Sequence, residues 1–346
     1  MSQRVVLLVN LGTPLSPKPK DVKRYLNEFL TDGRVIDIPW LPRQLLVKRI
    51  IVPRRYKMSA KTYQELWTKE GSPLLVHSRG AQAALQKKLG ARYKVHLAMR
   101  YQFPGLKDVL SCIERDGPCE ELIILPMFPQ YASATTGSIN ELVMKTVQNW
   151  QTVPSLQLIN TFAEHPAFIQ AWADVAKPYN VNSYDHILMS FHGLPERQIK
   201  KADSKSVCLT GTCCQTLNSK NLYCYKAQCY ATARALADKL SIKNYTVCFQ
   251  SRLGKSPWIQ PYASDVLKEC ANRKQKKLLV FSPAFVTDCL ETTIEIGEEY
   301  AEEFEEMGGE QLDLVPSLNT HPSWIQALHT LVKERETSSL QKIKCT

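Results

Sequence analysis

His186-Ile-Leu-Met-Ser-Phe-His-Gly-Leu-Pro195 is an apolar run that ends in a polar turn. The residues from Ile187 to Met189 predict a buried strand. After the strand, Gly193 permits an unusual backbone turn and Pro195 fixes the exit from it. His192 is therefore expected at the carboxyl end of a strand, where open α/β sheets bind their ligands. A histidine at an ordinary strand–loop corner has the same pattern, so the rest of the chain must decide between the two.

The same unit occurs near the N-terminus. The apolar run Val5–Val9 ends at Asn10-Leu-Gly-Thr-Pro14. When the two segments are aligned, the Gly and Pro of one turn coincide with those of the other, and Leu11 is aligned with His192. Two more units recur in the same order, namely Val95–Arg100 with Val247–Arg252, and Leu122–Thr136 with Leu278–Thr293. Three ordered repeats predict two structurally similar halves.

These repeats define the expected fold class. Apolar strands alternate with stretches of helical spacing, which is typical of parallel sheets. We predict an α/β fold with two similar Rossmann-like halves, each a parallel four-stranded-type sheet flanked by helices. Residues 1–165 form the first half and residues 166–346 the second, whose last helix can pack back on the first. The expected helices are Asp21–Leu30, Ser78–Leu89, Ser138–Trp150, Pro166–Val175, Ala227–Leu240 and Thr292–Met307.

Composition and charge limit the class of protein. With 346 residues, 44% hydrophobic and 22% charged, the chain is globular and too long for one typical core. It contains no uncharged apolar run of about 18 residues, and the run before Gly12 is too short for a signal peptide. We therefore expect a cytoplasmic protein, with peripheral membrane contact as an option. The net charge of +11 indicates an anionic partner, which is a membrane surface, a nucleic acid or an acidic small molecule.

Residues 39–57 mix bulky apolar side chains with a cluster of bases. A solvated amphipathic helix explains this pattern. A surface that rests on an anionic bilayer, or that admits a flat apolar substrate bearing carboxylates, explains it too. The sequence leaves these alternatives open.

Differences between the two halves indicate where chemistry takes place. At the aligned strand ends, the second half has His192 in place of Leu11 and Glu291 in place of Ala134. Both side chains are expected at the carboxyl ends of neighbouring strands, facing one cleft. Near pH 7 a neutral imidazole can accept a proton or bind a metal, and a carboxylate can do either.

Glu291, Glu295 and Glu299 lie four residues apart and form one file on a helix. A solvated acidic face is the ordinary explanation, and it suffices for Glu302 to Glu306. The first three begin at a strand end, however, and like charges in line cost energy unless a cation binds or passes there. This file is therefore a candidate path for a metal ion.

A polar loop within residues 203–229 concentrates five cysteines. Free cysteines are usually scattered and buried, so this concentration indicates thiolate coordination of zinc or of an iron–sulfur cluster. The spacing differs from the paired CxxC of a zinc ribbon, which favours a cluster, and unconnected thiols are the alternative. The five are Cys208, Cys213, Cys214, Cys224 and Cys229.

Met189-Ser-Phe-His-Gly-Leu-Pro195 resembles the signature of the ferrochelatase family, and the similarity extends over nearly the whole chain. Seven ordered motifs make the resemblance specific, and its type is bacterial. The other six are Val9-Asn-Leu-Gly-Thr-Pro14, Glu70-Gly-Ser-Pro73, Met99-Arg-Tyr101, Pro129-Gln-Tyr131 with Thr135-Thr136-Gly137, Phe249-Gln-Ser-Arg252 with Pro257-Trp258, and Asp288-Cys-Leu-Glu-Thr292.

The resemblance implies a class II chelatase fold with a porphyrin cleft between the halves, and insertion of Fe(II) into protoporphyrin IX to give protohaem. It implies that His192 and Glu291 are catalytic and bind metal, without deciding which of them takes the pyrrole protons. It adds Glu295, Glu299 and Asp288 to the metal path. The positions that it places along the porphyrin are Asn10, Leu11, Arg100, Tyr101, Ser133, Thr136 and Trp258.

Two positions depart from the family pattern. Some members have a histidine beside the metal-path aspartate, where this chain has Cys289. Many members with an iron–sulfur cluster use a cysteine in the Pro-Gln-Tyr motif and a C-terminal extension, but here the motif residue is Ala134 and the C-terminus has only Cys345. Resemblance to members with an internal insertion implies instead a [2Fe–2S] cluster, with zinc as the alternative. Its ligands are then Cys208, Cys213, Cys214 and Cys224, with Cys229 as a substitute.

Two other functions fit part of the sequence. A chelatase for another tetrapyrrole or another metal, such as cobalt or nickel, shares the architecture, but the full set of motifs argues against it. A basic iron–sulfur or zinc protein that binds nucleic acid explains the charge and the loop, but it leaves His192, Glu291 and the repeat without a role. We therefore expect protoporphyrin IX and Fe(II) as substrates, no nucleic-acid partner, and a monomer or a homodimer.

Overall fold

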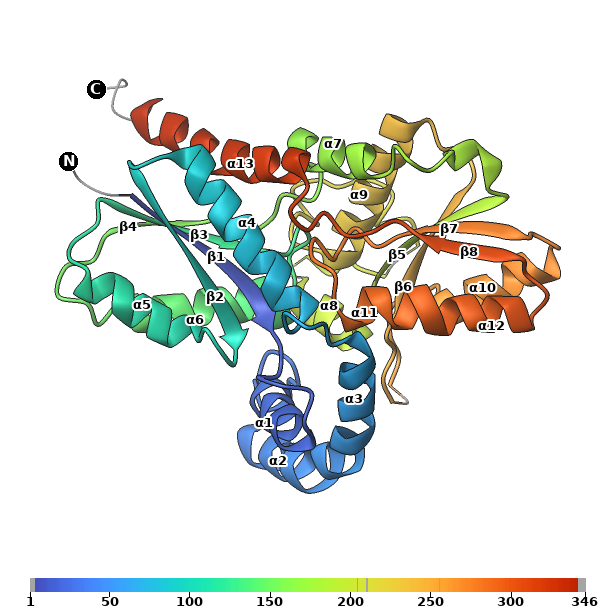
Figure 1. Cartoon of the computed structure of the whole chain (residues 1–346), viewed down its shortest axis with the longest axis horizontal. Coiled ribbons are helices and arrows are strands. Elements are labelled where there is room, and N and C mark those ends of the chain that lie inside the picture. Colours follow the sequence, from blue (N-terminus) through green and yellow to red (C-terminus); the bar gives the residue numbers. More distant parts are fainter. Residues whose placement is uncertain (1–3, 204, 210, 255, 342–346) are drawn as a thin grey trace.

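The computed structural model describes residues 4–203, 205–209, 211–254 and 256–341, and within them the strands form two parallel sheets (Figure 1). The first sheet has the order β2-β1-β3-β4 and the second β6-β5-β7-β8, so the two sheets have the same topology. The strands of the first are β1 (Arg4–Gly12), β2 (Tyr93–Tyr101), β3 (Glu121–Pro126) and β4 (Ser155–Leu158). Those of the second are β5 (His186–His192), β6 (Tyr245–Gln250), β7 (Lys277–Phe281) and β8 (Gln311–Leu314).

The shared order confirms the predicted fold class and its internal repeat. The repeat extends beyond the strands, because the loop after each second strand returns to it: Met99 N donates to Pro104 O, and Phe249 N donates to Pro261 O. The fourth strands, β4 and β8, complete the four-stranded sheets that the fold class predicts, but their positions were not located from the sequence. Each has only four residues, and its burial is partial.

Helices connect the strands, and every predicted helix is present. In the first half they are α1 (Pro19–Leu30), α2 (Trp40–Leu45), the π-helix η1 (Leu46–Ile51), α3 (Val52–Leu66), α4 (Pro73–Leu89), α5 (Leu106–Arg115), the π-helical turn η2 (Ser133–Gly137) and α6 (Ser138–Val147). In the second they are α7 (Pro166–Val175), the 3-10 turn η3 (Val181–Ser183), α8 (Glu196–Ala202), α9 (Tyr225–Leu240), α10 (Ala263–Asn272), α11 (Leu290–Thr293), the π-helix η4 (Glu295–Tyr300), α12 (Ala301–Glu306) and α13 (Pro322–Gln341). The single helix expected over 292–307 is thus interrupted by a π-helical segment.

One hydrophobic core is shared by both sheets. Along β1, Val5 and Leu7 pack on the face covered by α5 and α6, while Val6 and Leu8 pack on the opposite face. The cluster on that opposite face continues into β5 through Met189 and includes α4, α7, α9 and α13 (Figure 1, top). Helix α13 packs against α4 and α7, so the last helix does contact the first half. The division at residues 165 and 166 stays a prediction, since the core crosses it.

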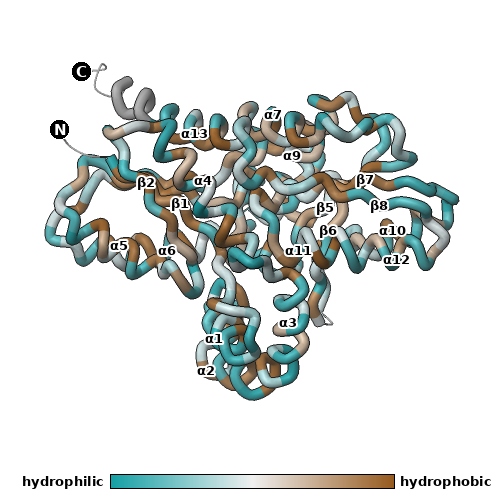
Figure 2. Tube along the Cα trace, viewed as in Figure 1, coloured by the Kyte–Doolittle hydropathy of each residue, from teal (hydrophilic) through white to brown (hydrophobic). Residues whose placement is uncertain are grey.

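The segment from α1 to α3, here called the helical arm (residues 19–66), projects from the carboxyl end of β1 (Figure 1). Its own small core centres on Leu30, Val47 and Val52. Apolar positions alternate with polar ones along its outer part (Figure 2), where several large side chains are exposed. These are Trp40, Leu41, Leu45, Ile50 and Met58. Among the described helices, none is both long enough and apolar enough to cross a bilayer.

Candidate active site

His192 is the last residue of β5 and is paired in register with Gln250, the last residue of β6. The turn after it approaches its neighbours so closely that only glycine fits. A Cβ on Gly193 would lie 2.9 Å from the Gln250 carbonyl oxygen and 3.1 Å from the Trp258 ring. Backbone bonds hold the Trp258 segment against this turn, including one from Ile259 N to Leu194 O of 3.0 Å. The turn therefore presents His192 at the carboxyl edge of the sheet, as predicted.

The imidazole of His192 is fixed in one tautomer by its own turn. Its Nδ1 lies 2.6 Å from the carbonyl oxygen of Gly193. A carbonyl oxygen only accepts, so Nδ1 must hold the hydrogen, which leaves Nε2 of the neutral ring with a free lone pair. The ring lies near those of Trp258 and Phe285, with 6.4 Å between centroids in each case. His192 is thus oriented with Nε2 as a proton or metal acceptor.

Gln250 links His192 to Glu291, which lies on α11 directly after β7. Its Nε2 donates to the backbone carbonyl of Glu291 at 2.7 Å, and its Oε1 accepts from the Ser190 hydroxyl at 2.8 Å. The Ser190 bond fixes the orientation of the buried amide. The structure therefore brings the two predicted catalytic residues to neighbouring positions. Gln250 belongs to the Phe249-Gln-Ser-Arg252 motif, but nothing in the local sequence indicates this role.

Two tyrosines of the helical arm approach Glu291 from the other side. Tyr25 of α1 and Tyr63 of α3 contact each other edge to face, with 6.2 Å between centroids. Desolvation raises the pKa of Tyr63, and the negative charge of Glu291 raises it further. The pKa of Tyr25 is raised by burial, then by Tyr63 and by Glu291. Helix α3 also packs against α11, so the helical arm contacts the helix that carries Glu291. Sequence reasoning missed both tyrosines.

Glu295 is held tightly at the end of β6. Its oxygens accept hydrogen bonds from the backbone N and hydroxyl of Ser251, at 2.8 and 2.5 Å, and from the Tyr300 hydroxyl at 3.2 Å. Glu299 follows it on η4. Partial desolvation raises the pKa of Glu299, and the charges of Glu295 and Glu65 raise it further. The predicted acidic file thus places Glu299 close to Glu295, with Glu295 already saturated by donors.

Asp288 occupies a different environment from the other acidic residues. Its two carboxylate oxygens accept from Ser317 N at 3.0 Å and from Asn319 Nδ2 at 2.6 Å. These bonds tie the end of the β7 segment to the loop before α13. Cys289, at the position where some relatives have histidine, is buried and caps α11 through a reciprocal pair of bonds with Thr292.

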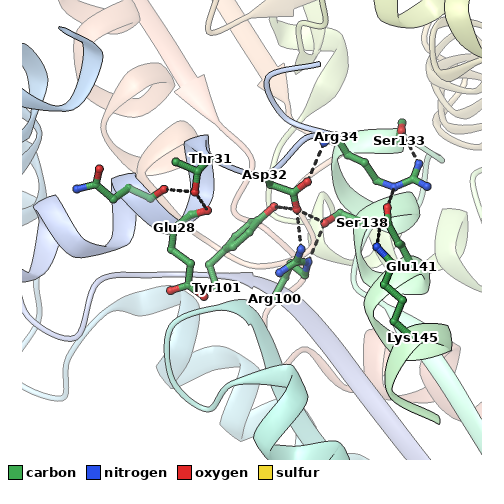
Figure 3. Close-up of polar contacts among 11 residues, drawn as sticks. Glu28, Thr31, Asp32, Arg34, Arg100, Tyr101, Ser133, Ser138, Glu141 and Lys145 are labelled. Carbon is green, nitrogen blue, oxygen red and sulfur yellow. Dashed lines mark hydrogen bonds and ion pairs between the residues drawn. The ribbon is translucent and has the colours of Figure 1, made fainter. Parts of the chain in front are cut away.

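Arg100 and Tyr101, at the end of β2, converge on a single carboxylate (Figure 3). Arg100 Nη2 lies 2.6 Å and the Tyr101 hydroxyl 2.9 Å from Oδ2 of Asp32, which also accepts from Ser138. Ser133 accepts from Arg34 at 2.9 Å in the same network. Sequence reasoning identified the residues on the sheet side but missed Asp32 and Arg34, which follow α1.

The other predicted porphyrin positions differ in accessibility. Asn10 is buried and donates to Ser78 at 3.2 Å, while Leu11 beside it is half-buried. Thr136 and Trp258 are buried, and within the described residues the Thr136 hydroxyl and the Trp258 indole N–H have no hydrogen-bond partner. Contact of these residues with a porphyrin stays a prediction.

Cys208 and Cys214 lie next to Cys224, the residue that precedes α9, and Cys213 lies next to Cys214. The thiols of Cys214 and Cys208 form hydrogen bonds with the Cys224 sulfur, and the sulfurs of Cys213 and Cys214 are 3.7 Å apart. The bond from Cys214 is the main reason why the pKa of Cys224 falls to about 6. Cys229 is fully buried on α9, where its sulfur is hydrogen-bonded to the Tyr225 hydroxyl.

The four cysteines are of the residue type that binds zinc or iron–sulfur clusters. Across the described residues, however, no group of three or more His, Cys, Asp or Glu side chains has the arrangement of a metal site. The thiols of Cys208 and Cys214 are instead hydrogen-bonded to the Cys224 sulfur. Cys345, the remaining C-terminal cysteine, lies outside the described residues.

Solved structures of chelatases have the same fold. The structure described as SirB from Bacillus subtilis with Fe3+ has a TM-score of 0.53 at 12% identity and covers 96% of this chain and 95% of its own. The sirohydrochlorin chelatase SirB from Bacillus subtilis subspecies spizizenii, in complex with cobalt, has a TM-score of 0.54 at 11% identity and covers 99% and 98%. At such identity the similarity shows the two-half chelatase fold alone.

Sequence comparison is more specific. The family profile described as Ferrochelatase matches residues 3–336. Ferrochelatase of Legionella pneumophila (strain Paris) is 45% identical over 335 residues, which cover 96% of this chain and 99% of the relative. Ferrochelatase of Pseudomonas putida is 44% identical over 334 residues, which cover 95% and 98%. Together with the site at the ends of β5, β6 and β7, these matches show that the chain belongs to the ferrochelatase family.

Proposed function

We propose that His192 and Glu291 form the reaction centre of this chain. Membership of the ferrochelatase family makes the chain an enzyme that inserts Fe(II) into protoporphyrin IX to give protohaem. The observation that supports the residue assignment is the 2.6 Å contact between Nδ1 of His192 and the Gly193 carbonyl, because it leaves Nε2 as a free acceptor. Glu291 is linked to the same strand edge through Gln250.

The reaction requires the two pyrrole protons to leave as iron enters. In a flat macrocycle the nitrogen lone pairs lie in the ring plane, so binding energy elsewhere must bend the ring to expose them. We assign proton acceptance to Nε2 of His192, whose lone pair is left free by the Nδ1 contact with the Gly193 carbonyl. Trp258 and Phe285, whose rings both lie 6.4 Å from the imidazole between centroids, would provide apolar contact to the macrocycle.

Iron delivery is assigned to the acidic file. Glu291 and Glu299 offer carboxylate oxygens, which suit Fe(II) without binding it so firmly that it cannot be released. Glu295 is engaged by Ser251 and Tyr300, so its role in the path is to place its charge beside Glu299. Asp288, with both oxygens bonded to the loop before α13, fits a positioning role in the same path.

An anaerobic metallation assay tests these assignments. The wild type is expected to convert the absorption spectrum of protoporphyrin to that of haem when Fe(II) is added. His192→Ala is expected to bind porphyrin and keep its fold but lose turnover. His186→Ala is the matched control, because His186 lies at the other end of β5 and bonds with Thr246. Near-normal turnover of His192→Ala would contradict the assignment, and metallation by cobalt or nickel alone would indicate a different chelatase.

We also propose that the cysteine loop binds a [2Fe–2S] cluster through Cys208, Cys213, Cys214 and Cys224. The Cys224 sulfur, just before α9, is hydrogen-bonded to the thiols of Cys208 and Cys214, and its lowered pKa suits a metal ligand. When bound, the cluster would supply one-electron redox chemistry and a covalent cross-link of the loop. Cys229 bonds with Tyr225 instead, which supports its rank as a substitute ligand.

The visible spectrum of the anaerobically purified protein tests the cluster. Bands of a [2Fe–2S] centre, with two iron and two sulfide per chain, are expected in the wild type and in Cys229→Ser, and their loss in Cys224→Ser. A colourless protein that contains one zinc ion per chain would establish the zinc alternative. A protein with neither would leave the thiols without a metal and refute the proposal.

The outer part of the helical arm is the proposed membrane contact. It combines exposed apolar residues, among them Trp40 and Leu41, with the bases Lys48, Arg49 and Arg54. Such a surface binds anionic lipid through burial of its apolar side chains and through electrostatic attraction to its bases. Co-sedimentation with vesicles containing anionic lipid should be lost at high salt and in Trp40→Ser/Leu41→Ser. Absence of binding at low salt would leave the cytoplasmic location predicted from the sequence, without membrane contact.

A further inference from the structure

The cysteine loop ends one residue before a side chain that contacts the reaction centre. Cys224 is the residue that caps the N-terminus of α9, and Tyr225 is the first residue of that helix. The Tyr225 hydroxyl donates a 2.8 Å hydrogen bond to the backbone carbonyl of His192. Tyr225 is 7% exposed, so this bond is shielded from competing water.

This bond acts on the peptide unit that orients the imidazole. The carbonyl of His192 and the N–H of Gly193 belong to one planar peptide. Tyr225 holds the carbonyl end of that plane, and Gln250 O accepts from the N–H end at 2.8 Å. Rotation of the plane would move the next carbonyl, that of Gly193, to which Nδ1 of the imidazole donates. Tyr225 is therefore a positioning group for the ring.

The same helix turn is braced on its other side. The Gln228 side chain accepts from Tyr131 N at 2.6 Å and donates to Leu222 O at 2.6 Å. The rings of Tyr131 and Tyr223 lie 5.2 Å apart. The first turn of α9 thus sits between the cysteine loop, His192 and the Pro-Gln-Tyr motif of the first half, with few degrees of freedom.

We propose that Tyr225 couples the state of the cysteine loop to the orientation of His192. The Cys224 sulfur is hydrogen-bonded to the Cys208 and Cys214 thiols. A metal or cluster would replace those bonds with metal–sulfur bonds and reposition the cap of α9. The carbonyl of His192 would follow through the Tyr225 hydroxyl. This inference rests on the proposed role of His192, and it gives the loop a function in the chelatase reaction.

The first test removes the hydroxyl alone. In Tyr225→Phe, the porphyrin KM should stay within about twofold while kcat falls roughly tenfold or more, as for other partners that orient a functional histidine. The ¹⁵N signal of His192 Nδ1, assigned by its absence in His192→Ala, should shift. Tyr230→Phe is the control, because Tyr230 lies on the same helix and its ring contact with Lys226 survives in Phe. Equal behaviour of the two variants would overturn the positioning role.

The second test measures the coupling itself. Cys213→Ser perturbs the loop at its half-buried cysteine, 3.7 Å from Cys214 and away from α9. It should shift the His192 Nδ1 signal in the presence of Tyr225, but not in the Tyr225→Phe background. No shift in either background, or the same shift in both, would refute the coupling. The NMR signal is measured without turnover, so this test does not depend on the catalytic assignment. If His192→Ala metallates porphyrin, only the catalytic assignment is refuted.

Discussion

Gly12 and Gly193 occupy equivalent turns of the repeat but are required for different reasons. Gly12 has a φ of +115°, and a Cβ there would lie 1.9 Å from the carbonyl oxygen of Tyr101 on the neighbouring strand. At Gly193 the Gln250 carbonyl oxygen and the Trp258 ring leave no space for a Cβ. A repeat in the sequence therefore identifies both positions, while the neighbour that imposes glycine is known only from the folded sheet.

Gly12→Ala is expected to destabilise the protein more than Gly117→Ala does. Gly117 has a similar φ of +109°, but nothing lies within 4 Å of its Cβ position. The control thus reports backbone strain alone, on the order of 1–3 kcal/mol. Gly12→Ala adds a backbone clash that only a movement of β1 or β2 can relieve. Urea unfolding of both variants measures the difference, and equal free energies of unfolding would contradict the clash.

Gln250→Glu tests the link between His192 and Glu291, the two proposed catalytic residues. The Gln250 side-chain nitrogen lies 3.1 Å from a Glu295 oxygen in a buried site, so an ionised replacement would face a like charge. We expect kcat to fall roughly 10- to 100-fold near neutral pH and to recover partly at lower pH, where the new carboxyl holds its proton. Gln250→Met removes the donor without adding charge and should show no recovery. A pH-independent loss in both variants would contradict the charge argument.

At the scale of the element, the helix after β7 places its acidic residues at a cost to stability. The π-helix η4 lies between α11 and α12, in the stretch that contains Glu295 and Glu299. Single-turn π segments of this kind are frequent at functional sites. Because partial desolvation and the like charges around Glu299 raise its pKa, the folded protein binds a proton there more readily than the unfolded chain.

Glu299→Gln should therefore stabilise the fold at pH 7. The raised pKa means that folding carries a penalty above that pKa, and the penalty disappears as the pH falls below the ordinary value of 4.5. Unfolding by urea should show a small gain at pH 7 and none at pH 4, since the exposed side chain is partly screened. Glu306→Gln, at the exposed end of α12, is the control. A gain at pH 4 equal to that at pH 7 would contradict the electrostatic origin.

Elements with long apolar runs could be predicted from the sequence. The strands from Val5, Leu122, Ile187 and Leu278 were found because each is buried on both faces. Short β4 and β8 give no such signal. In the site, the sequence could predict that His192 and Glu291 lie at strand ends, because the repeat showed them as differences between the halves; their catalytic role stays a prediction.

Other site residues could not be predicted because they act through contacts between distant segments. Asp32 bonds to Arg100 and Tyr101, and Tyr25 and Tyr63 approach Glu291 across more than 200 residues of chain. Nothing in the local pattern around Asp32 or Tyr25 distinguishes it from an ordinary helical neighbour. Such contacts are a property of the packed molecule.

For the whole molecule, the shared core makes the halves depend on each other. Trp324 of α13 is fully buried, and its ring lies 5.9 Å from that of Phe162 and 6.2 Å from that of Phe168. The cluster that contains it includes residues of both sheets. Loss of this side chain should therefore weaken the first and second halves together.

Trp324→Ala is expected to cost about 3–5 kcal/mol of unfolding free energy while unfolding stays a single transition. Trp324→Phe should cost much less, because the indole N–H has no hydrogen-bond partner within the described residues. Urea unfolding followed by circular dichroism, with limited proteolysis of each half, measures this. Two separate transitions would show that the division at residues 165 and 166 marks independent domains.

The packing of α13 on α4 and α7 also has a consequence for biosynthesis. The first sheet is complete once β4 has been made, but α13 begins about 160 residues later. At about 5–20 residues per second, a ribosome would need roughly 8–30 seconds to bridge that interval. During this time the nascent chain exposes the apolar face that α13 will cover, which makes it a substrate for chaperones and proteases until the helix emerges.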